Sequence, residues 1–403
     1  MQTRFAIVGA GMAGLAAALV ARRLQWQVDV FERSPALQEV GAGIQLGPNA
    51  TRILRAWGLD AALAPLAVRP KAVEAWCAER GERLATLDLA ALAARHGAPY
   101  LSIHRADLQQ VLAQAAQSAG AQLHLGQPVQ ALHLQPQAVQ LDTRAESYAA
   151  VAVADGVWSP LRAQVLSPEA QDQTPLRWSG HVAYRALLPM SSVPASWRLQ
   201  TVQVWMAPRL HAVVYPIRAG ECLNVVVLVA HQAASNLGQD RGWDALADPE
   251  AVQADLAHAL RGTHAQFQSL RESVPEWRVW PLMSRVPVAG AHHWGQGARA
   301  VLLGDAAHPM LPYLAQGAGM AIEDAHVLGQ TMREASVAQW PLRLQAFARA
   351  RNDRVARVQR TAARNGGVFH ATGGVRWGRD WALRLAGERL MEARWLYGER
   401  HGL

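Results

Sequence analysis

Short apolar runs that end at a glycine or an acidic residue shape the first part of the chain. Residues 4–8 are apolar and partly β-branched, which is typical of a buried parallel strand. Residues 12–24 follow as an alanine-rich helix, and residues 28–31 as a second strand. Strand, helix and strand together predict a βαβ unit at the start of the chain.

The middle of the chain contains two different patterns. Apolar residues at helical spacing predict a helix over 107–119, and residues 151–154 and 300–303 predict short strands that end directly at polar motifs. Between about 176 and 290 the pattern predicts strands separated by turn residues, at 202–206, 211–215 and 223–229. We therefore expect a largely antiparallel sheet in a second domain.

After Gly319 the pattern is helical and rich in arginine. We interpret its regularly spaced arginines as a solvated helix face; they are Arg349, Arg351, Arg354, Arg357 and Arg360. Because no internal repeat or low-complexity linker separates the regions, we expect the domains to be interleaved in sequence.

Composition adds limits on the partners. With 403 residues, 51% of them hydrophobic and 17% charged, the chain is globular and can bury a sizeable core. The net charge of +8 comes from 39 basic residues, all arginine except Lys71, a choice that codon bias in a GC-rich genome explains better than a nucleic-acid surface. No basic run is interleaved with aromatic residues, so we expect no nucleic-acid partner. A positive field still favours anionic substrates.

Cysteines and apolar stretches bear on the compartment. Cys77 and Cys222 form neither a disulfide framework nor a metal motif, which fits a reducing cytosol and predicts no metal site. The apolar stretch 5–21 could be a signal peptide, but glycines at turn spacing favour a strand, turn and helix. No other stretch reaches the ~20 apolar residues that span a bilayer. We expect a cytoplasmic protein without a membrane partner.

The turn between the first strand and its helix carries a dinucleotide fingerprint. In this pattern Gly9 permits the tight turn, Gly11 lets the backbone approach a pyrophosphate, and Gly14 allows close helix–strand packing. The phosphates would then face the positive end of the helix. Glu32 ends the second strand, where an acid accepts hydrogen bonds from an adenosine ribose and argues against a 2′-phosphate. A second complete fingerprint is missing, so the permanently held dinucleotide is expected to be FAD, with NADH or NADPH visiting briefly.

Further motifs along the chain resemble one family. The segments 155–162, 303–309 and 316–325 resemble the flavin motifs of single-component FAD-dependent aromatic hydroxylases. Matches also occur at 41–49, 104–108 and 395–398. The similarity is greatest to the branch that hydroxylates salicylate, 3-hydroxybenzoate and 6-hydroxynicotinate. Ala315 stands where a glycine is common, as in the 3-hydroxybenzoate and 6-hydroxynicotinate enzymes, so salicylate is less favoured.

This resemblance implies an α/β fold with three regions. A doubly wound FAD-binding domain is interleaved with an antiparallel-sheet substrate domain, and a helical C-terminal region follows. We expect the FAD-binding domain to take up 1–70, 100–175 and 280–330, the substrate domain 71–99 and 176–279, and the C-terminal region 331–403.

The resemblance also implies roles for cofactor-binding residues. Asp305 would bond the ribityl hydroxyls, Arg105 would lie near the pyrophosphate or ribityl chain, and Asp155 would link flavin binding to nicotinamide access. Main-chain groups at Gly317 and Ala318 would meet the pyrimidine edge of the flavin. The complete set of expected cofactor contacts is Gly9, Gly11, Ala13, Gly14, Glu32, Arg33, Leu46, Arg105, Asp155, Asp305, Gly317 and Ala318.

Two residues are candidates for catalysis. His211 and Tyr215 are four residues apart on one predicted strand, so both side chains lie on the same face of it. Histidine titrates near neutral pH and can take the proton of a phenol, which tyrosine can orient or relay. The alternative is that both residues only pack in the core. The resemblance favours catalysis. Tyr313 and Pro312 follow the flavin motif and are expected to face the ring as substrate contacts, with Gln45 on the pocket wall, and His308 is expected to have a structural role near the flavin.

We therefore predict an NAD(P)H-consuming, FAD-dependent monooxygenase. It would use O2, by way of a flavin hydroperoxide, to hydroxylate a small aromatic acid that bears a ring hydroxyl. A 3-hydroxybenzoate-type reaction is the first candidate, and a decarboxylative 6-hydroxynicotinate- or salicylate-type reaction is the alternative. A flavin-dependent halogenase or oxidase, and a non-catalytic flavoprotein, stay open, as does the oligomeric state, with a homodimer as one alternative.

Overall fold

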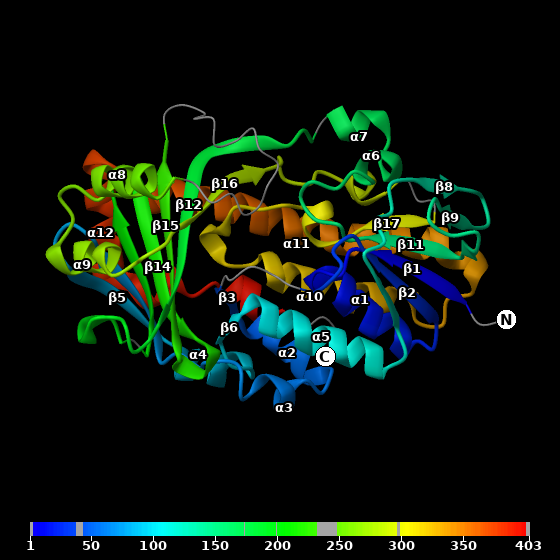
Figure 1. Ribbon diagram of the computed structural model, residues 1–403, viewed down its shortest axis with the longest axis horizontal. Coiled ribbons are helices and arrows are strands. Elements are labelled where there is room, and N and C mark those ends of the chain that lie inside the picture. The colour runs from blue at the N-terminus through cyan, green and yellow to red at the C-terminus, as the bar shows by residue number, and fades with distance from the viewer. Residues whose placement is uncertain are drawn as a thin grey trace.

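A computed structural model of the chain describes residues 3–37, 43–172, 174–198, 200–231, 248–295 and 299–399. Positions 41 and 42 of the expected motif 41–49 lie outside these ranges. The molecule is elongated, with a parallel sheet near the N-terminus at one end and a larger sheet at the other (Figure 1). Within the described ranges, none of the helices has the length and hydropathy needed to cross a bilayer.

The first sheet is parallel and deeply buried. Its strand order is β17 (Ala300–Leu302), β11 (Ala150–Val153), β1 (Arg4–Val8), β2 (Gln27–Glu32) and β7 (Gln122–Leu125). Strands β11 and β17 are apolar throughout, and β1 is apolar after Arg4, as expected for strands covered on both faces. Helix α1 (Met12–Arg23) packs against α5 (Arg105–Ser118) and α10 (Gly317–Met332). Because parallel strands end at one edge, the segments after β1, β11 and β17 meet there.

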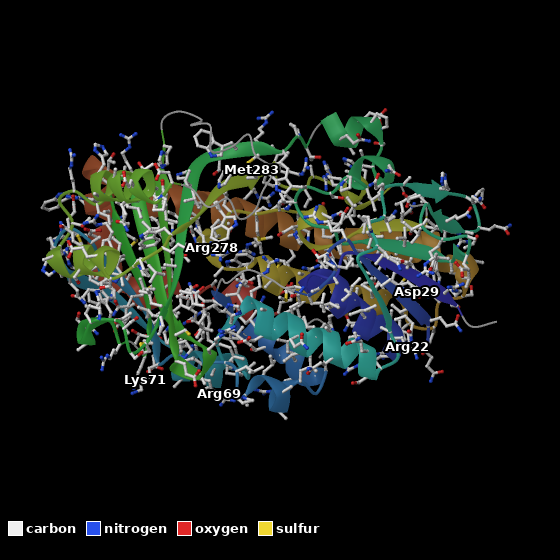
Figure 2. The ribbon with its side chains drawn as sticks, in the orientation of Figure 1. Arg22, Asp29, Arg69, Lys71, Arg278 and Met283 are labelled. Carbon is white, nitrogen blue, oxygen red and sulfur yellow. The ribbon has the colours of Figure 1, made fainter. Side chains whose placement is uncertain are left out.

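The second sheet has seven strands and forms the floor of the other lobe. Its order is β16 (Arg278–Ser284), β12 (Arg177–Pro189), β15 (Cys222–Ala230), β14 (Leu210–Ile217), β13 (Val202–Ala207), β4 (Ala72–Cys77) and β5 (Glu82–Asp88). All neighbours are antiparallel except β13 and β4. One face packs on α8 (Pro249–Ala259) and α9 (Ala265–Glu272) through Leu256 and Phe267. Figure 2 shows Arg278 and Met283 near opposite ends of β16.

Smaller elements connect the lobes. A ribbon of β3 (Gly43–Leu46) and β6 (Leu101–His104) contacts β14 across the junction, since Ser102 Oγ donates to the carbonyl of Pro216 (2.6 Å). The other elements are the three-stranded sheet β10 (Ser147–Tyr148), β9 (Val139–Leu141) and β8 (Leu132–Leu134), and helices α2 (Pro48–Ala56), α3 (Asp60–Leu63), α4 (Leu89–His96), α6 (Arg162–Val165) and α7 (Pro168–Asp172).

The C-terminal region is helical. It comprises the end of α10, the thirty-residue α11 (Trp340–Phe369), α12 (Gly373–Met391) and α13 (Arg394–Tyr397). The expected α/β fold, with its parallel and antiparallel sheets and helical C-terminal region, is thereby confirmed. The division into domain segments stays a prediction; the boundary expected at 279/280 falls inside β16.

The interpretation of the α11 arginines as a solvated face is wrong for two of them. Arg351 and Arg354 are buried, whereas the remaining three are exposed. The Arg351 guanidinium bonds Asp324 (2.8 Å) and Glu323 (2.9 Å), and Arg354 bonds Glu323 (2.6 Å). A buried cation of this kind needs a partner from elsewhere in the chain, and the partners, on α10, lie 27 or more positions earlier. The spacing of the arginines along α11 therefore does not show which of them have such acidic partners.

Candidate active site

The fingerprint glycines lie where the three strand ends meet. Gly9 has a φ of 101°, and a Cβ there would overlap the carbonyl of Ala154, which follows β11. A Cβ at Gly14 would overlap the carbonyl of Gly9. At Gly11, by contrast, a Cβ would meet nothing within 4 Å. The chain is thus tightly packed behind the turn and open in front of it, which is what close approach of a phosphate to the backbone requires.

Glu32 fixes this turn and can still accept further hydrogen bonds. Its carboxylate accepts hydrogen bonds from the backbone N–H groups of Ala10 (2.8 Å) and Ser34 (2.9 Å). Since a carboxylate offers about four lone-pair sites, acceptor capacity remains for a ribose. Gln109 of α5 donates to the carbonyl of Ala10 (2.9 Å), so both β2 and α5 fix this turn.

Arg105 is close enough to Asp305 for its charge to act on the Asp305 carboxyl group. The Asp305 side chain is exposed, yet the surrounding protein desolvates it and raises its pKa. The charges of Arg105 and His308 act to lower that pKa. An exposed group that is also desolvated lines a cleft rather than an outer surface. Gly317 at the start of α10 likewise has open space in front of it. Ribityl hydroxyls and phosphates fit this combination of acceptor, cation and helix N-terminus.

The remaining expected cofactor residues surround the same strand ends. Burial raises the pKa of Asp155 to about 6, partly offset by bonds within its own loop and by the charge of Arg33. Ala13 is buried, and Gly304 approaches it so closely that a Cβ at Gly304 would lie 2.8 Å from the Ala13 methyl. Leu46 is buried on β3, and Ala318 is half-buried on α10. These positions are compatible with FAD, and each contact stays a prediction.

The open face of the seven-stranded sheet carries the candidate catalytic residues. Cross-strand pairing joins His211 to Leu228, Leu228 to Ala183, and Tyr215 to Asn224. Alternation along β12 then places Arg185 on this same face. Aliphatic residues and Trp280 form an apolar wall around these polar groups. Nε of Arg185, Nδ2 of Asn224 and Oη of Tyr313 are buried and have no hydrogen-bond partner in the described part of the chain.

His211 belongs to a cluster of three histidines. Its Nδ1 lies 2.7 Å from Nε2 of His370, which follows α11, and the ring of His181 on β12 lies 4.9 Å from that of His370. Burial, together with the two neighbouring imidazoles, lowers the pKa of His211 well below its usual value. Burial also lowers the pKa of His370 to about 3 and that of His181 below its usual value. All three are therefore neutral at physiological pH.

These pKa shifts predict a loss of stability in mild acid. The unfolded chain binds protons at all three imidazoles below about pH 6.5, whereas the folded chain does not. The folded pKa values are depressed, so the stability they contribute is present above about pH 6.5 and declines as the pH falls. We expect the free energy of unfolding in urea to fall between about pH 6.5 and 5, by up to about 1.4 kcal/mol per pH unit for His211. A His211→Gln variant should show a shallower decline, and an identical slope would contradict this assignment.

Other expected substrate contacts lie around the same space. The Tyr313 ring, in the turn Pro312–Leu314, lies 5.2 Å from that of His211 and packs over Gly366. Gln45 accepts a hydrogen bond from Tyr100 (2.6 Å). Gln45 also bonds Tyr215. Burial raises the pKa of Tyr215 to about 12, although the charge of Arg185 and the bond to Gln45 act to lower it. Pro312 is half-buried beside Tyr313.

His308 belongs to the ion network beneath the flavin motif. Its Nε2 lies 2.6 Å from Asp324, which also accepts from the N–H of Gly304 (3.0 Å). Burial acts to raise the pKa of Asp324, but the charges of His308 and Arg351 and these hydrogen bonds hold it below its usual value. This network fixes the second flavin motif against α10 and α11. The structural role expected for His308 stays a prediction.

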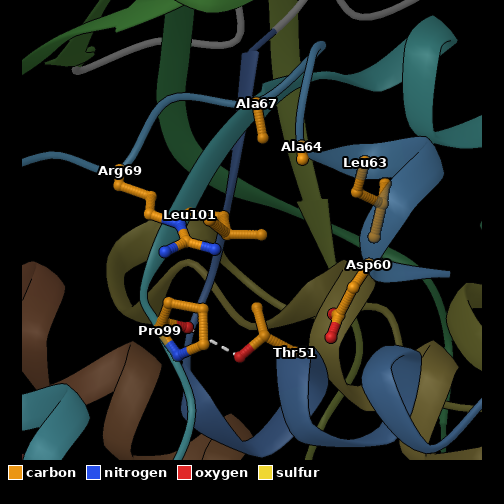
Figure 3. A pocket seen from close by; sticks show the side chains of 8 residues that line it. All are labelled: Thr51, Asp60, Leu63, Ala64, Ala67, Arg69, Pro99 and Leu101. Carbon is orange, nitrogen blue, oxygen red and sulfur yellow. Dashed lines mark hydrogen bonds between the residues drawn. The ribbon is translucent and has the colours of Figure 1, made fainter. Parts of the chain in front are cut away.

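A small pocket elsewhere is not a candidate site. It lies under α2 and α3, is lined by Thr51, Asp60, Arg69 and neighbouring apolar residues, and has a volume of about 30 Å³ (Figure 3). That volume suits about one water molecule. Thr51 donates to the carbonyl of Pro99 across it (2.6 Å).

Comparisons with known proteins agree with this geometry. The family described as "FAD binding domain" matches residues 2–362. The chain belongs to this family. A 3-hydroxybenzoate 6-hydroxylase from Polaromonas naphthalenivorans (strain CJ2) is 33% identical over 97% of this chain and 95% of its own. A 6-hydroxynicotinate 3-monooxygenase from Bordetella bronchiseptica is 32% identical over 90% and 91%. A salicylate hydroxylase substrate complex has a TM-score of 0.84 at 23% identity, covering 100% of this chain and 96% of that one.

Family membership confirms the resemblance to FAD-dependent aromatic hydroxylases and the assignment of FAD as cofactor. It also confirms that the chain is an enzyme of the monooxygenase class.

Four residues of the candidate site were not predicted from the sequence: Arg185, Asn224, His370 and Trp280. The sequence does contain a signal for Arg185 and Asn224. Each lies inside an apolar strand, where an arginine or an asparagine is rarely buried without a ligand or partner. Their placement opposite His211 and Tyr215 depends on strand register, and that of His370 on how a distant helix packs.

Proposed function

We propose that this FAD-dependent enzyme hydroxylates a phenolic aromatic acid, with 3-hydroxybenzoate as the first candidate. The observation that carries this proposal is the set of unpartnered donors on the apolar sheet face beside His211. Arg185, Asn224 and Tyr313 each present a buried donor atom without a partner in the described part of the chain. Unpaired donors inside an apolar wall are costly unless a ligand satisfies them. An aromatic carboxylate offers a planar apolar ring together with acceptor oxygens.

Each side chain on this face has a separate role in the proposed reaction. Arg185 stacks on Trp280, with its guanidinium carbon 4.8 Å from the ring centroid, and can hold a carboxylate there. Nδ1 of His211 is taken by His370, so Nε2 is the atom that remains to accept the proton of the ring hydroxyl. Tyr215, whose raised pKa keeps it protonated, can donate a hydrogen bond to the developing phenolate. Val226, Leu228 and Trp280 exclude water from the ring.

FAD, when bound, accepts electrons from NADH or NADPH and activates O2 for transfer to the ring. The role of His211 is to increase the electron density of that ring by removing its hydroxyl proton. A low pKa favours this role because it keeps the imidazole unprotonated and ready to accept.

A substrate panel tests the proposal. Holoenzyme is incubated with 3-hydroxybenzoate, salicylate or 6-hydroxynicotinate, and substrate-stimulated NADH and NADPH oxidation is measured together with product mass. We expect stimulated oxidation and a hydroxylated product that retains its carboxyl group. Product mass is needed because uncoupled peroxide release also consumes NADH.

The second candidate is decarboxylative hydroxylation of 6-hydroxynicotinate, favoured by similarity to the Bordetella enzyme. In that case the carboxyl group is lost as CO2 during hydroxylation. A chloride-dependent product would instead indicate a halogenase, and peroxide without any ring product an oxidase. Either result would overturn the proposal.

We also propose a cytoplasmic location. Cys77 and Cys222 are both free thiols, which is usual in a reducing compartment. Localisation of the tagged enzyme by cell fractionation tests this, and recovery from the membrane or periplasmic fraction would contradict it.

A further inference from the structure

Helix α12 carries an apolar face that nothing in the described part of the chain covers. Its side chains Trp377, Trp381 and Leu385 are 63%, 53% and 78% exposed. They follow at four-residue spacing, so they form one ridge along the helix. Figure 1 shows α12 in the lobe of the seven-stranded sheet, away from the N-terminus.

The opposite face of α12 is firmly attached. A Cβ at Gly387, which follows a kink at Ala386, would overlap Ala85 of β5, so the last part of the helix lies directly on that strand. Asp380 is buried and bonds Arg80 (2.8 Å), and Arg379 donates to the carbonyl of Phe369 (2.8 Å). The exposed ridge is therefore presented by a helix that is fixed in place.

The area of the ridge suits a protein interface. A tryptophan side chain buries roughly 150–250 Å² when covered, so two half-exposed tryptophans with Leu385 offer on the order of 400 Å². That lies within the range of the largest apolar patches on monomers, which are often functional. It is about half of the ~800 Å² that each partner contributes to a stable dimer.

The surrounding charges favour a protein over an anionic membrane. Arg376 pairs with Glu79, Arg379 with Asp380, and Arg384 with Glu82. Three of the four arginines on the helix are thus neutralised within the same chain. A helix that binds lipid headgroups needs unpaired basic residues on its polar side.

The ridge is complementary to itself about a two-fold axis. Two small residues, Gly378 and Ala382, are exposed next to the tryptophans and leave room for side chains of a partner. If two copies of α12 cross antiparallel at Trp381, Trp377 of one copy meets Leu385 of the other, and each ridge faces the small residues of its partner.

We propose that the exposed face of α12 is the interface of a homodimer formed by two copies of this chain.

Light scattering on size-separated holoenzyme, over a series of concentrations, measures the oligomeric state. We expect a dimer that Trp381→Glu weakens on the order of 100-fold or more, since it places two like charges across the axis. Trp381→Leu should keep the dimer. Leu342→Glu on α11 is the matched control, because Leu342 is 63% exposed but lies away from this ridge. Flavin absorbance per protein checks that each variant is folded.

A cross-link makes the test specific. Under mild oxidation Trp381→Cys should form a covalent dimer, whereas Leu342→Cys should not. A monomeric wild-type protein, or a dimer that Trp381→Glu leaves intact, would overturn the proposal. So would co-sedimentation of wild-type protein with anionic phosphatidylserine vesicles that Trp381→Glu abolishes.

His370 contacts His211, the base assigned in the proposed function, and its role rests on that function. His370 is held on both sides: its N–H donates to Gly366 (3.1 Å), and its carbonyl accepts from the N–H of Arg209 in the turn before β14 (3.1 Å). Its side chain is 9% exposed and its Nδ1 has no partner in the described ranges. The charged and titratable groups facing it are His211, His181 and Arg379, with Tyr313 beside them.

We infer that His370 is a positioning residue for His211. For Nε2 of His211 to accept a proton, its Nδ1 must carry the hydrogen and donate it to Nε2 of His370. The 2.7 Å contact fixes the ring plane of His211, and it selects this tautomer when His370 carries its own proton on Nδ1 and presents Nε2 as the acceptor. The C-terminal helices would therefore control the base from outside the substrate domain.

Two variants separate positioning from a purely structural role. We expect His370→Phe to lower kcat by about tenfold or more with little change in KM, and His370→Gln, which keeps a side-chain acceptor, to recover much of it. The absorbance of a bound phenolic acid should also show less phenolate in His370→Phe at neutral pH. An unchanged kcat and pH profile in His370→Phe would refute the inference. A wild-type enzyme inactive on every phenolic acid would instead refute the proposed function.

Discussion

Replacing His211 by alanine is expected to lower the rate of ring hydroxylation by about 10²- to 10⁴-fold, the usual contribution of a general base. The variant should still bind FAD and oxidise NADH, because His211 lies on the sheet face and not among the flavin motifs. More of the NADH consumed should then end as hydrogen peroxide. Stopped-flow product formation, together with peroxide measurement, separates the two fates.

The pH profile makes this prediction specific. Raising the pH ionises a phenol in solution near its own pKa of about 10, and a substrate that is already ionised needs no base. The rate of the His211→Ala variant should therefore rise with pH toward that of the wild type. The control is His133→Ala, which removes an exposed histidine from β8. If His211→Ala keeps the wild-type rate and profile, another group removes the proton.

Two glycine variants should separate cofactor binding from folding. Gly14→Ala forces a methyl group into the carbonyl of Gly9, and we expect it to destabilise the protein by about 3 kcal/mol or more, even without FAD. Gly11→Ala meets no protein atom within 4 Å and sits at a φ of −76° that alanine adopts freely. Its apo form should unfold within about 0.5 kcal/mol of the wild type.

The affinity for FAD should fall in Gly11→Ala, although the stability of its apo form should not. The new methyl group of Gly11→Ala stands where a phosphate is expected to approach, so we predict a loss of about 3 kcal/mol of FAD affinity, on the order of 100-fold. Calorimetric titration of the apoprotein measures it, and the thermal unfolding of the same sample reports stability. Wild-type affinity in Gly11→Ala would show that the pyrophosphate lies elsewhere.

Much of the fold was predictable because it depends on local signals. Strand β1, helix α1 and strand β2 follow directly from apolar runs and glycines, and β13, β14 and β15 from strands separated by turns. Residues His211 and Tyr215 could be placed on one face because alternation along a strand has a fixed period. The resemblance supplied Asp305 and Arg105, which no periodicity indicates.

What could not be predicted depends on contacts between distant segments. Arg351 and Arg354 share their helical period with exposed arginines, and only Glu323 and Asp324 on α10 distinguish them. Arg185 and Asn224 reach the site through the pairing of β12 with β15 and of β15 with β14. His370 reaches it because a thirty-residue helix ends beside β14. Each of these is a consequence of tertiary packing rather than of local sequence.

The strand order β17-β11-β1-β2-β7 has a consequence for how the enzyme is made. The edge expected to receive the dinucleotide begins with β1, the first of these strands in the chain, and is completed by β17, which ends at Leu302. The whole stretch from Arg4 to Leu302 must therefore be synthesised before the parallel sheet is complete, a long-range closure of the kind that folds slowly. A nascent chain can form the complete dinucleotide edge only after β17 has been made.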